Sequence, residues 1–345
     1  MLSKKQMSEL REHLERAQNP VFYYDNDADG LCSFVLLRKF LGRGNGVAVR
    51  SYPDLNASYA HKASELKADY VFVLDKPVLS QEFVNAIQGM NLPFVWIDHH
   101  IMGDKNPYAG VQVYNSAGNG KSGEPVTAMV YNLTKCKEDL WIALMGCIAD
   151  HHLPVFASEF KKEHPEYWSK GIKKPFDAYY KSEIGKLARA INFGLKDSAG
   201  NVIALQNFLI SCRSPADMFA EVSENKSFRE KYNELLKKYN SFIESAEKNL
   251  SEKMLFFVYG GEVSMSADIA NELSYRHPEI FVVVAYMKGA ILNLSLRGAG
   301  VKKMLEKILP KLENATGGGH ADAVGARIRT SDLEKFKELL SKEIT

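Results

Sequence analysis

Four clusters of acidic and histidine side chains in this 345-residue sequence each follow a run of apolar residues. Residues 25–30 read DNDADG, Asp75 stands alone, residues 98–100 read DHH, and Asp150 ends a fourth apolar run. Carboxylate and imidazole groups accept protons, donate protons and bind metal ions. These positions are therefore where the chain could do chemistry.

Carboxylates crowded into one crevice repel one another, and the repulsion raises their pKa values unless a cation balances it. A mixed set of carboxylate oxygens and imidazole nitrogens suits Mn²⁺ or Zn²⁺ better than Ca²⁺, which takes oxygen ligands. Two divalent ions about 3.5–4 Å apart can hold both the attacking and the leaving oxygen of an in-line phosphoryl transfer. Because the candidate ligands are numerous enough for two ions, the sequence predicts a dinuclear metal site.

Each cluster also has a simpler interpretation. An Asp-rich turn after a strand is often a helix N-cap or an Asx turn, and DxDxDG resembles part of a calcium-binding loop. The calcium interpretation fails because position 36, where that loop needs a bidentate Glu, is Leu36. A His-His pair alone is more often a surface or core feature than a pair of ligands. The joint occurrence of the clusters at several strand ends favours the metal site.

The elements that must position these clusters are predicted β-strands. Apolar runs at Pro20–Tyr24, Val47–Tyr52, Tyr70–Leu74 and Pro93–Ile97 alternate with helix-like segments. The runs show no alternation of apolar and polar residues, which is typical of a parallel sheet covered on both faces. Ligands of an open α/β sheet bind at the carboxyl ends of its strands, so the clusters should converge there. The prediction is an α/β fold with a doubly wound, mainly parallel sheet.

The rest of the chain is expected to form a connector and a second domain. We expect an N-terminal catalytic domain over residues 1–190, a helical connector over 191–252, and a smaller C-terminal α/β domain with a mixed sheet over 253–345. Apolar residues at helical spacing between Tyr232 and Ile243 indicate an amphipathic helix within the connector.

A glycine-rich turn in the second domain is the other place where the chain could bind a ligand. Gly317, Gly318 and Gly319 leave the backbone open to close approach, and their N–H groups could bind phosphate oxygens. The simpler interpretation is a plain loop or a helix C-cap. His320 beside the glycines, and Arg297 at the end of a predicted strand, favour an anion-binding site because a guanidinium group fits phosphate.

The composition excludes several classes of protein. Lys and Arg number 44 against 42 Asp and Glu, so no large positive charge drives nucleic-acid binding. The four cysteines lack the spacing of a disulfide framework or a zinc finger. The charged N-terminal segment does not have the pattern of a signal peptide, and no apolar run approaches the ~18–20 residues of a membrane span. We therefore expect a cytoplasmic protein without a membrane partner.

Taken together, the motifs resemble those of the DHH phosphoesterase family. The DxDxDG motif, Asp75, the DHH sequence at 98–100 and Asp150 are similar to the four motifs of that family. The GGGH sequence at 317–320 is similar to the signature of its DHH-associated C-terminal domain. The third Asp of the first motif resembles the RecJ-like nucleases, whereas the nanoRNase/pAp-phosphatase branch more often has a His before DxD.

The resemblance implies a role for each of these residues, with two departures from the family pattern. Asp25 stands where other branches use His, and Asp75 lies in the sequence LDKP, which matches the family motif only at the Asp. The resemblance implies that Asp25, Asp27 and Asp75 bind one metal ion and that Asp29, Asp75, His99 and Asp150 bind a second. It implies that Asp98 orients the histidines and that His100 contacts the scissile phosphate. The substrate-binding residues that it implies are Arg297, Gly317, Gly318, Gly319 and His320.

The resemblance also implies an activity. We expect a phosphodiesterase or exonuclease that uses two Mn²⁺ ions, or Mg²⁺ or Co²⁺ in their place, to hydrolyse single-stranded DNA, RNA or short oligonucleotides to mononucleotides. Alternatives within the same chemistry are a nanoRNase/pAp phosphatase and a cyclic-dinucleotide phosphodiesterase. An alternative of another class is a non-catalytic scaffold of a replication complex, although a scaffold has no physical need for mutually repelling carboxylates. The oligomeric state is left open, with a homodimer as one option.

Overall fold

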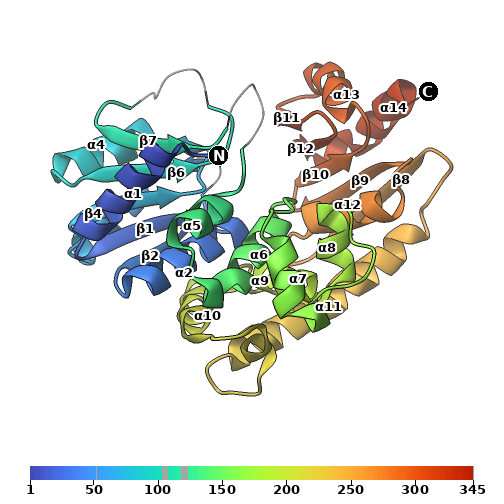
Figure 1. The fold of residues 1–345 in the computed structure, drawn as a ribbon. Coiled ribbons are helices and arrows are strands. Elements are labelled where there is room, and N and C mark those ends of the chain that lie inside the picture. Colours follow the sequence, from blue (N-terminus) through green and yellow to red (C-terminus); the bar gives the residue numbers. More distant parts are fainter. Residues whose placement is uncertain (52, 103–107, 118–122, 345) are drawn as a thin grey trace. The chain divides into compact units, whose positions relative to one another are not determined.

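Apolar strands build the centre of the first of two units in the computed structural model, which describes residues 1–51, 53–102, 108–117 and 123–344 (Figure 1). The units are Met1–Tyr232 and Asn233–Thr345. Their boundary falls inside one long helix, α11 (Lys226–Glu247). The expected domain limits at 190 and 252 stay a prediction.

Five parallel strands form the main sheet of the first unit, in the order β2-β1-β4-β6-β7. They are β1 (Pro20–Asp25), β2 (Asn45–Val49), β4 (Tyr70–Leu74), β6 (Phe94–Asp98) and β7 (Val111–Asn115). Two short strands, β3 (Asp54–Leu55) and β5 (Val78–Leu79), pair with each other in a separate small sheet. The predicted α/β fold with a parallel sheet is confirmed.

Two strands of this sheet differ from the prediction. The predicted strand Val47–Tyr52 runs instead from Asn45 to Val49, because its pairing partner β1 ends opposite Val49. Tyr52 lies outside the described residues. Strand β7 was not predicted: it lies at the edge of the sheet, where part of it is exposed, so its sequence lacks the continuous apolar character of the inner strands.

Helices cover both faces of the sheet, which explains the unbroken apolar strands. On β1, Tyr23 packs against Phe83 of one helix, whereas the next residue, Tyr24, stacks on Phe34 of another with 5.2 Å between ring centres. Successive side chains of a strand point to opposite faces, so both faces must be apolar. The helices of this unit are α1 (Lys4–Arg16), α2 (Ala28–Leu41), α3 (His61–Glu65), α4 (Gln81–Gly89), α5 (Val126–Thr134), α6 (Leu140–Ala149), α7 (Ala157–Glu163), α8 (Pro175–Lys181), α9 (Glu183–Gly194) and α10 (Ala199–Ser211).

The second unit contains a mixed sheet in the order β11-β12-β10-β9-β8. The predicted presence of a mixed sheet is therefore confirmed. Strands β8 and β9 are parallel, and the other neighbouring pairs are antiparallel. The elements are β8 (Met254–Gly260), α12 (Ser266–Arg276), β9 (Phe281–Lys288), β10 (Ile291–Arg297), α13 (Val301–Ile308), β11 (Thr316–His320), β12 (Ala323–Arg329) and α14 (Leu333–Glu343).

The prediction of a glycine-rich turn at Gly317–Gly319 was wrong. These residues belong to the edge strand β11, which pairs with β12. A Cβ atom added to Gly317 would lie 2.7 Å from the carbonyl oxygen of Gly325 on β12. The glycines therefore permit a close approach of two backbones, a property that their sequence does not distinguish from the freedom to turn.

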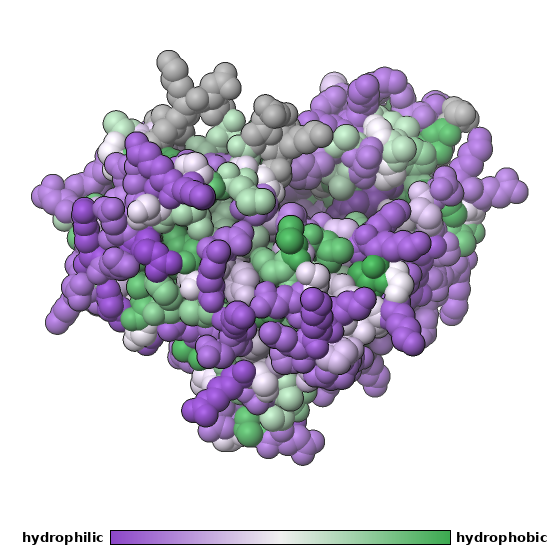
Figure 2. Space-filling model, in the orientation of Figure 1, coloured by the Kyte–Doolittle hydropathy of each residue, from purple (hydrophilic) through white to green (hydrophobic). Residues whose placement is uncertain are grey.

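Apolar side chains gather in the cores of the two units, and in Figure 2 the surface on view is dominated by hydrophilic residues. A few large apolar side chains are exposed, among them Val155 and Ile101. Within the described residues, no helix has both the length and the apolar character that a bilayer span requires.

The packing of α6 against α2 and α5 yields the first prediction. A Cβ atom added to Gly146 would lie 2.9 Å from Cβ of Cys32 and would also collide with Thr127. We expect Gly146→Val to lower the free energy of unfolding by about 2–3 kcal/mol through overpacking. Urea unfolding followed by circular dichroism measures this difference.

The matched control is Gly89→Ala at the exposed end of α4, where a Cβ meets nothing within 4 Å and the change should be neutral or stabilising. An equal effect of the two substitutions would contradict the packing argument.

Candidate metal centre

The register of the parallel sheet brings the predicted acidic clusters to one edge. Tyr24 on β1 lies opposite Leu74 on β4, and Leu74 lies opposite Ile97 on β6. The residues that follow, Asp25, Asp75 and Asp98, are therefore neighbours across three adjacent strands. This convergence was predicted from the apolar runs alone, because parallel strands end at the same edge.

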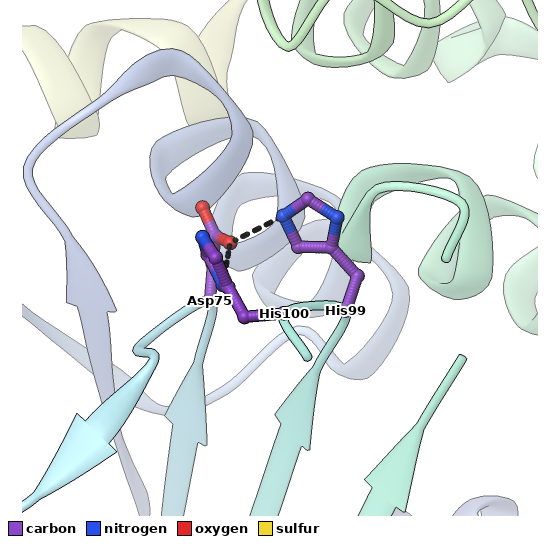
Figure 3. Close-up of side chains that lie close together, drawn as sticks. All are labelled: Asp75, His99 and His100. Atoms are coloured by element: carbon purple, nitrogen blue, oxygen red, sulfur yellow. Dashed lines mark ion pairs between the residues drawn. The ribbon is translucent and has the colours of Figure 1, made fainter. Parts of the chain in front are cut away.

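Asp75 lies at the centre of the cluster. Its carboxylate oxygen Oδ1 is 3.2 Å from Nε2 of His99 and 3.8 Å from Nδ1 of His100, and both imidazoles are directed toward it (Figure 3). The side chain is buried, yet Oδ1 has no hydrogen-bond partner among the described residues. A buried oxygen without a partner is costly unless a cation or a water binds it.

Asp75 itself has a strained backbone conformation. Its φ of +58° lies in the left-handed region, which a residue other than glycine adopts only at a cost of about 1–3 kcal/mol. The amide of Asp75 still donates to the carbonyl of Ile97 at 2.9 Å, so the residue continues the sheet before turning. Burial, followed by the charges of Asp29 and Asp27, raises its pKa well above the ordinary value.

Asp29 has a second role that the sequence did not reveal. Its two carboxylate oxygens accept hydrogen bonds from the backbone amides of Val126 and Thr127 at the N-terminus of α5, both at 2.8 Å. The Thr127 hydroxyl donates back to the Asp29 carbonyl at 2.9 Å. Each oxygen of Asp29 keeps a further lone pair with which it could bind a metal ion. Asp29, His99 and Asp150 bring potential ligand atoms within 4.8 Å of one another. The carboxylate thus anchors α5 beside the cluster.

Asp27 serves as the N-cap of α2. Its Oδ1 accepts from the Gly30 amide at 2.9 Å, so the helix-cap interpretation of the Asp-rich turn is confirmed. Asp27 is exposed to solvent. Desolvation of its carboxylate by neighbouring protein atoms, together with the charges of Asp25 and Asp29, raises the pKa of Asp27 to about 7.

Asp25 is paired with a lysine that sequence analysis missed. Nζ of Lys76 lies 3.0 Å from Oδ1 of Asp25 and donates to the Ser51 carbonyl at 2.8 Å. The Lys76 side chain is completely buried. Burial raises the pKa of Asp25, while the Lys76 charge acts in the opposite direction. The only sequence signal was the position of Lys76 directly after Asp75, at the same strand end.

Asp98 contacts His100 rather than both histidines. Its Oδ1 lies 2.9 Å from Nδ1 of His100, and its Oδ2 accepts from the His100 amide at 3.2 Å. Asn115 of the unpredicted strand β7 donates to the His100 carbonyl at 3.0 Å and so also holds this residue. Although burial disfavours its charged form, the bond to Asp98 raises the pKa of His100. Burial lowers the pKa of His99, which favours the neutral form that binds metal.

Asp150 completes the cluster from the end of α6. Its Oδ2 lies 3.7 Å from Nε2 of His99, and the side chain is partly exposed. Burial of the carboxylate, followed by the charges of Asp29 and Asp27, raises its pKa well above the ordinary value. His152, two residues further on, is electrostatically coupled to Asp29 and His99, and burial lowers its pKa. His152 is a further neighbour of the cluster that the sequence did not assign.

The donor set fits a divalent cation of the Mn²⁺ type. Two groups each bring three potential ligand atoms within 4.8 Å: Asp75, His99 and His100 in one, and Asp29, His99 and Asp150 in the other. Both groups mix carboxylate oxygens with imidazole nitrogens, the combination that suits Mn²⁺. The orphaned Oδ1 of Asp75 is the atom that such an ion would satisfy.

The predicted substrate residues lie in the second unit. Arg297 on β10 and His320 on β11 both pair with Ala323 of β12, so they flank the same position of the sheet. Nε of Arg297 donates to Oδ1 of Asn271 at 2.6 Å, and Nη1 donates to the Leu296 carbonyl at 2.8 Å. The guanidinium is thus held in place by the protein. Residues 317–320 are exposed along the edge strand.

Residues 21–150 match the DHH family, N-terminal domain. A search of curated protein sequences found no match to the chain. The family that the motifs indicated is therefore found over the part of the chain that contains the four acidic clusters.

Solved structures with the same fold include two RecJ proteins and a DHH domain. RecJ from Thermus thermophilus in complex with Mn²⁺ is 15% identical with a TM-score of 0.66, over 99% of this chain and 54% of that one. Exonuclease RecJ bound to manganese is 15% identical with a TM-score of 0.63, and the match covers 99% of this chain and 93% of the RecJ chain. The DHH domain of a protein described as a member of a ribosomal protein family is 14% identical with a TM-score of 0.67. This match covers 99% of this chain and 89% of the other chain. This chain thus spans about half the length of the Thermus RecJ chain.

The raised pKa of Asp27 predicts how pH affects the metal-free protein. A carboxyl group whose pKa rises from 3.8 to about 7 on folding stabilises the fold below the lower value, and this contribution is lost as pH rises through the higher value. We expect the melting temperature in a chelator to fall between about pH 4 and about pH 7, and to fall less in Asp27→Asn, which keeps a helix cap. Scanning calorimetry of both proteins measures this, and the same pH slope in the two would contradict it.

Proposed function

We propose that this chain, whose residues 21–150 match the DHH family N-terminal domain, is a metal-dependent phosphodiesterase that hydrolyses single-stranded nucleic acid or short oligonucleotides to mononucleotides. The observation that carries the proposal is the orphaned carboxylate oxygen of Asp75, buried between two imidazoles at the edge of the sheet. The DHH family is a phosphoesterase family, and two structures of this fold are RecJ proteins with bound Mn²⁺, one of them described as an exonuclease.

The metal would be Mn²⁺, with Mg²⁺ or Co²⁺ as substitutes. Asp29, Asp75, His99 and Asp150 would hold one ion, and three of these residues bring ligand atoms within 4.8 Å of one another. Asp25, Asp27 and Asp75, which lie at or just after the ends of two neighbouring strands, would hold a second ion. When bound, the ions supply Lewis acidity that polarises the phosphoryl oxygens and balances the charge that develops on them. The protein's contribution is to bring at least five carboxylates together, which their mutual repulsion opposes in the absence of cations.

His100 would interact with the scissile phosphate. Its Nδ1 is engaged by Asp98, and the charged form of the ring is favoured by that bond. Nε2 of the charged ring then carries a proton that it can donate to a phosphate oxygen. Asp98 itself is buried and held by Asn115, so its proposed role is to orient His100 and not to touch the substrate.

The second unit would bind the nucleotide chain. The exposed backbone of β11 at Gly317, Gly318 and Gly319 could offer N–H groups to phosphate oxygens, with no side chain in the way. Arg297, held by Asn271, would add positive charge at one end of the sheet, and His320 would add a hydrogen-bond donor there. A fixed guanidinium loses less freedom on binding phosphate than a mobile one.

A substrate panel tests the proposed reaction and its alternatives. The metal-loaded protein is incubated with 5′- and 3′-labelled single-stranded DNA and RNA of several lengths, and with pAp, a cyclic dinucleotide and pyrophosphate. The proposal expects mononucleotides from the single strands. Cleavage of pAp or of the cyclic dinucleotide alone would favour the alternative phosphodiesterases. Metal binding without hydrolysis of any substrate would favour the scaffold.

Replacement of Asp75 tests the metal centre directly. We expect Asp75→Asn to reduce Mn²⁺-dependent hydrolysis by at least about a hundredfold, because even indirect partners of metal ligands contribute about 10–100-fold. The matched control is Asp139→Asn, at a buried carboxylate of the same unit that pairs with Lys39 at 3.1 Å. The control variant should keep the rate of the unaltered protein. Full activity of Asp75→Asn with a normal circular dichroism spectrum would exclude a central role for Asp75.

Replacement of His320 tests substrate binding by the second unit. We expect His320→Ala to raise KM for an oligonucleotide by about tenfold, the loss of one hydrogen bond to a charged group, while changing kcat little. Hydrolysis of a small aryl phosphodiester, which has no nucleotide chain for the second unit to bind, should be unaffected. Lys307→Ala provides the control, since this exposed cation of the same unit pairs with Glu343 at 2.7 Å. Equal losses on both substrates would refute a role in holding the nucleotide chain.

A further inference from the structure

The backbone carbonyl and the ammonium group of Lys76 both form hydrogen bonds, and the ammonium group lies beside Asp25 at one side of the acidic cluster. The carbonyl accepts from Nε1 of Trp96 at 2.9 Å, and the ammonium group bonds Asp25 and the Ser51 carbonyl. The side chain is completely buried, whereas that of Asp25 keeps about a fifth of its surface exposed. A buried lysine in such surroundings cannot turn away to solvent without breaking these bonds.

Lys76 and Asn26 together fill one of the two carboxylate oxygens of Asp25. Oδ1 of Asp25 accepts from Nζ of Lys76 at 3.0 Å and from the amide of Asn26 at 2.9 Å. A carboxylate oxygen has two lone pairs, so both sites on this oxygen are filled. A divalent ion bound to Asp25 would also meet the positive charge of Lys76 at close range in a buried setting, where like charges repel strongly.

The other side of the cluster is arranged differently. The carboxylates of Asp75 and Asp150 pair with Nε2 of His99, at 3.2 and 3.7 Å. A neutral imidazole does not repel a cation and can itself bind one. Oδ1 of Asp75 remains without a hydrogen-bond partner within the described part of the chain. The two proposed metal positions therefore differ in charge and in the number of oxygen lone pairs they offer.

We infer that Lys76 makes the two metal positions unequal. One divalent ion binds tightly among Asp29, Asp75, His99 and Asp150, whereas the position that needs Asp25 stays weak as long as Lys76 holds that carboxylate. This inference rests on the proposed metal centre. Lys76 is thus a positioning residue: it holds Asp25 and determines how many ions the resting protein carries.

Metal content measures this inference without any assay of activity. The full chain is dialysed against micromolar Mn²⁺, and bound Mn²⁺ is counted by mass spectrometry and by electron paramagnetic resonance, which separates isolated ions from coupled pairs. The unaltered protein should hold one isolated ion per chain. Lys76→Met, similar in length but uncharged, should hold two coupled ions, with the affinity for the second raised by at least about tenfold. Lys76→Arg, which keeps the charge, should hold one.

A matched control separates the effect of Lys76 from the removal of any partly buried lysine. Lys39 pairs with Asp139 at 3.1 Å in the same unit, and Lys39→Met should leave one ion per chain. Two ions of similar affinity in the unaltered protein would overturn the inference, as would an unchanged content in a folded Lys76→Met. If that variant does not fold, the titration of the unaltered protein decides alone. Absence of any bound Mn²⁺ would instead refute the proposed metal centre and, with it, the proposed function.

Discussion

The register of one parallel sheet concentrates negative charge at a single edge, and much of the first unit depends on that constraint. Because Tyr24, Leu74 and Ile97 lie opposite one another on adjacent strands, the acidic residues that follow them are forced into proximity. Carboxylates gathered in this way raise one another's pKa values unless positive charge or hydrogen-bond donors surround them. The neighbouring elements supply both.

Several of the carboxylates have a compensating partner of their own. The N-terminus of α5 donates two backbone hydrogen bonds to Asp29, the ammonium group of Lys76 pairs with Asp25, and the ring of His100 binds Asp98. Asp75 is the exception, since its Oδ1 is buried without a hydrogen-bond partner among the described residues. Asp75 is therefore the carboxylate of the cluster that the described residues compensate least, which is why the proposed metal centre is placed there.

Much of the fold could be predicted because its causes are local. Continuous apolar runs indicated buried parallel strands, and the strands indicated where the acidic residues would meet. Strand β7 escaped prediction because an edge strand needs no continuous apolar run. Strand β11 was mistaken for a turn because glycine allows both a turn and a close backbone pairing, and only the partner strand β12 decides between them.

The sequence by itself determined the chemical character of the centre: which carboxylates and imidazoles are present, and that strand ends bring them together. Only the tertiary structure decided how each group is used. Lys76 follows Asp75 in the chain but binds Asp25, which is 51 positions away, and Asp29 holds the start of a helix almost 100 residues later. Such pairings are set by the packing of distant segments, and neither the spacing nor the type of the residues reveals them. For the same reason, the sequence predicted two metal positions, whereas the pairing of Lys76 with Asp25 led to the inference that they differ.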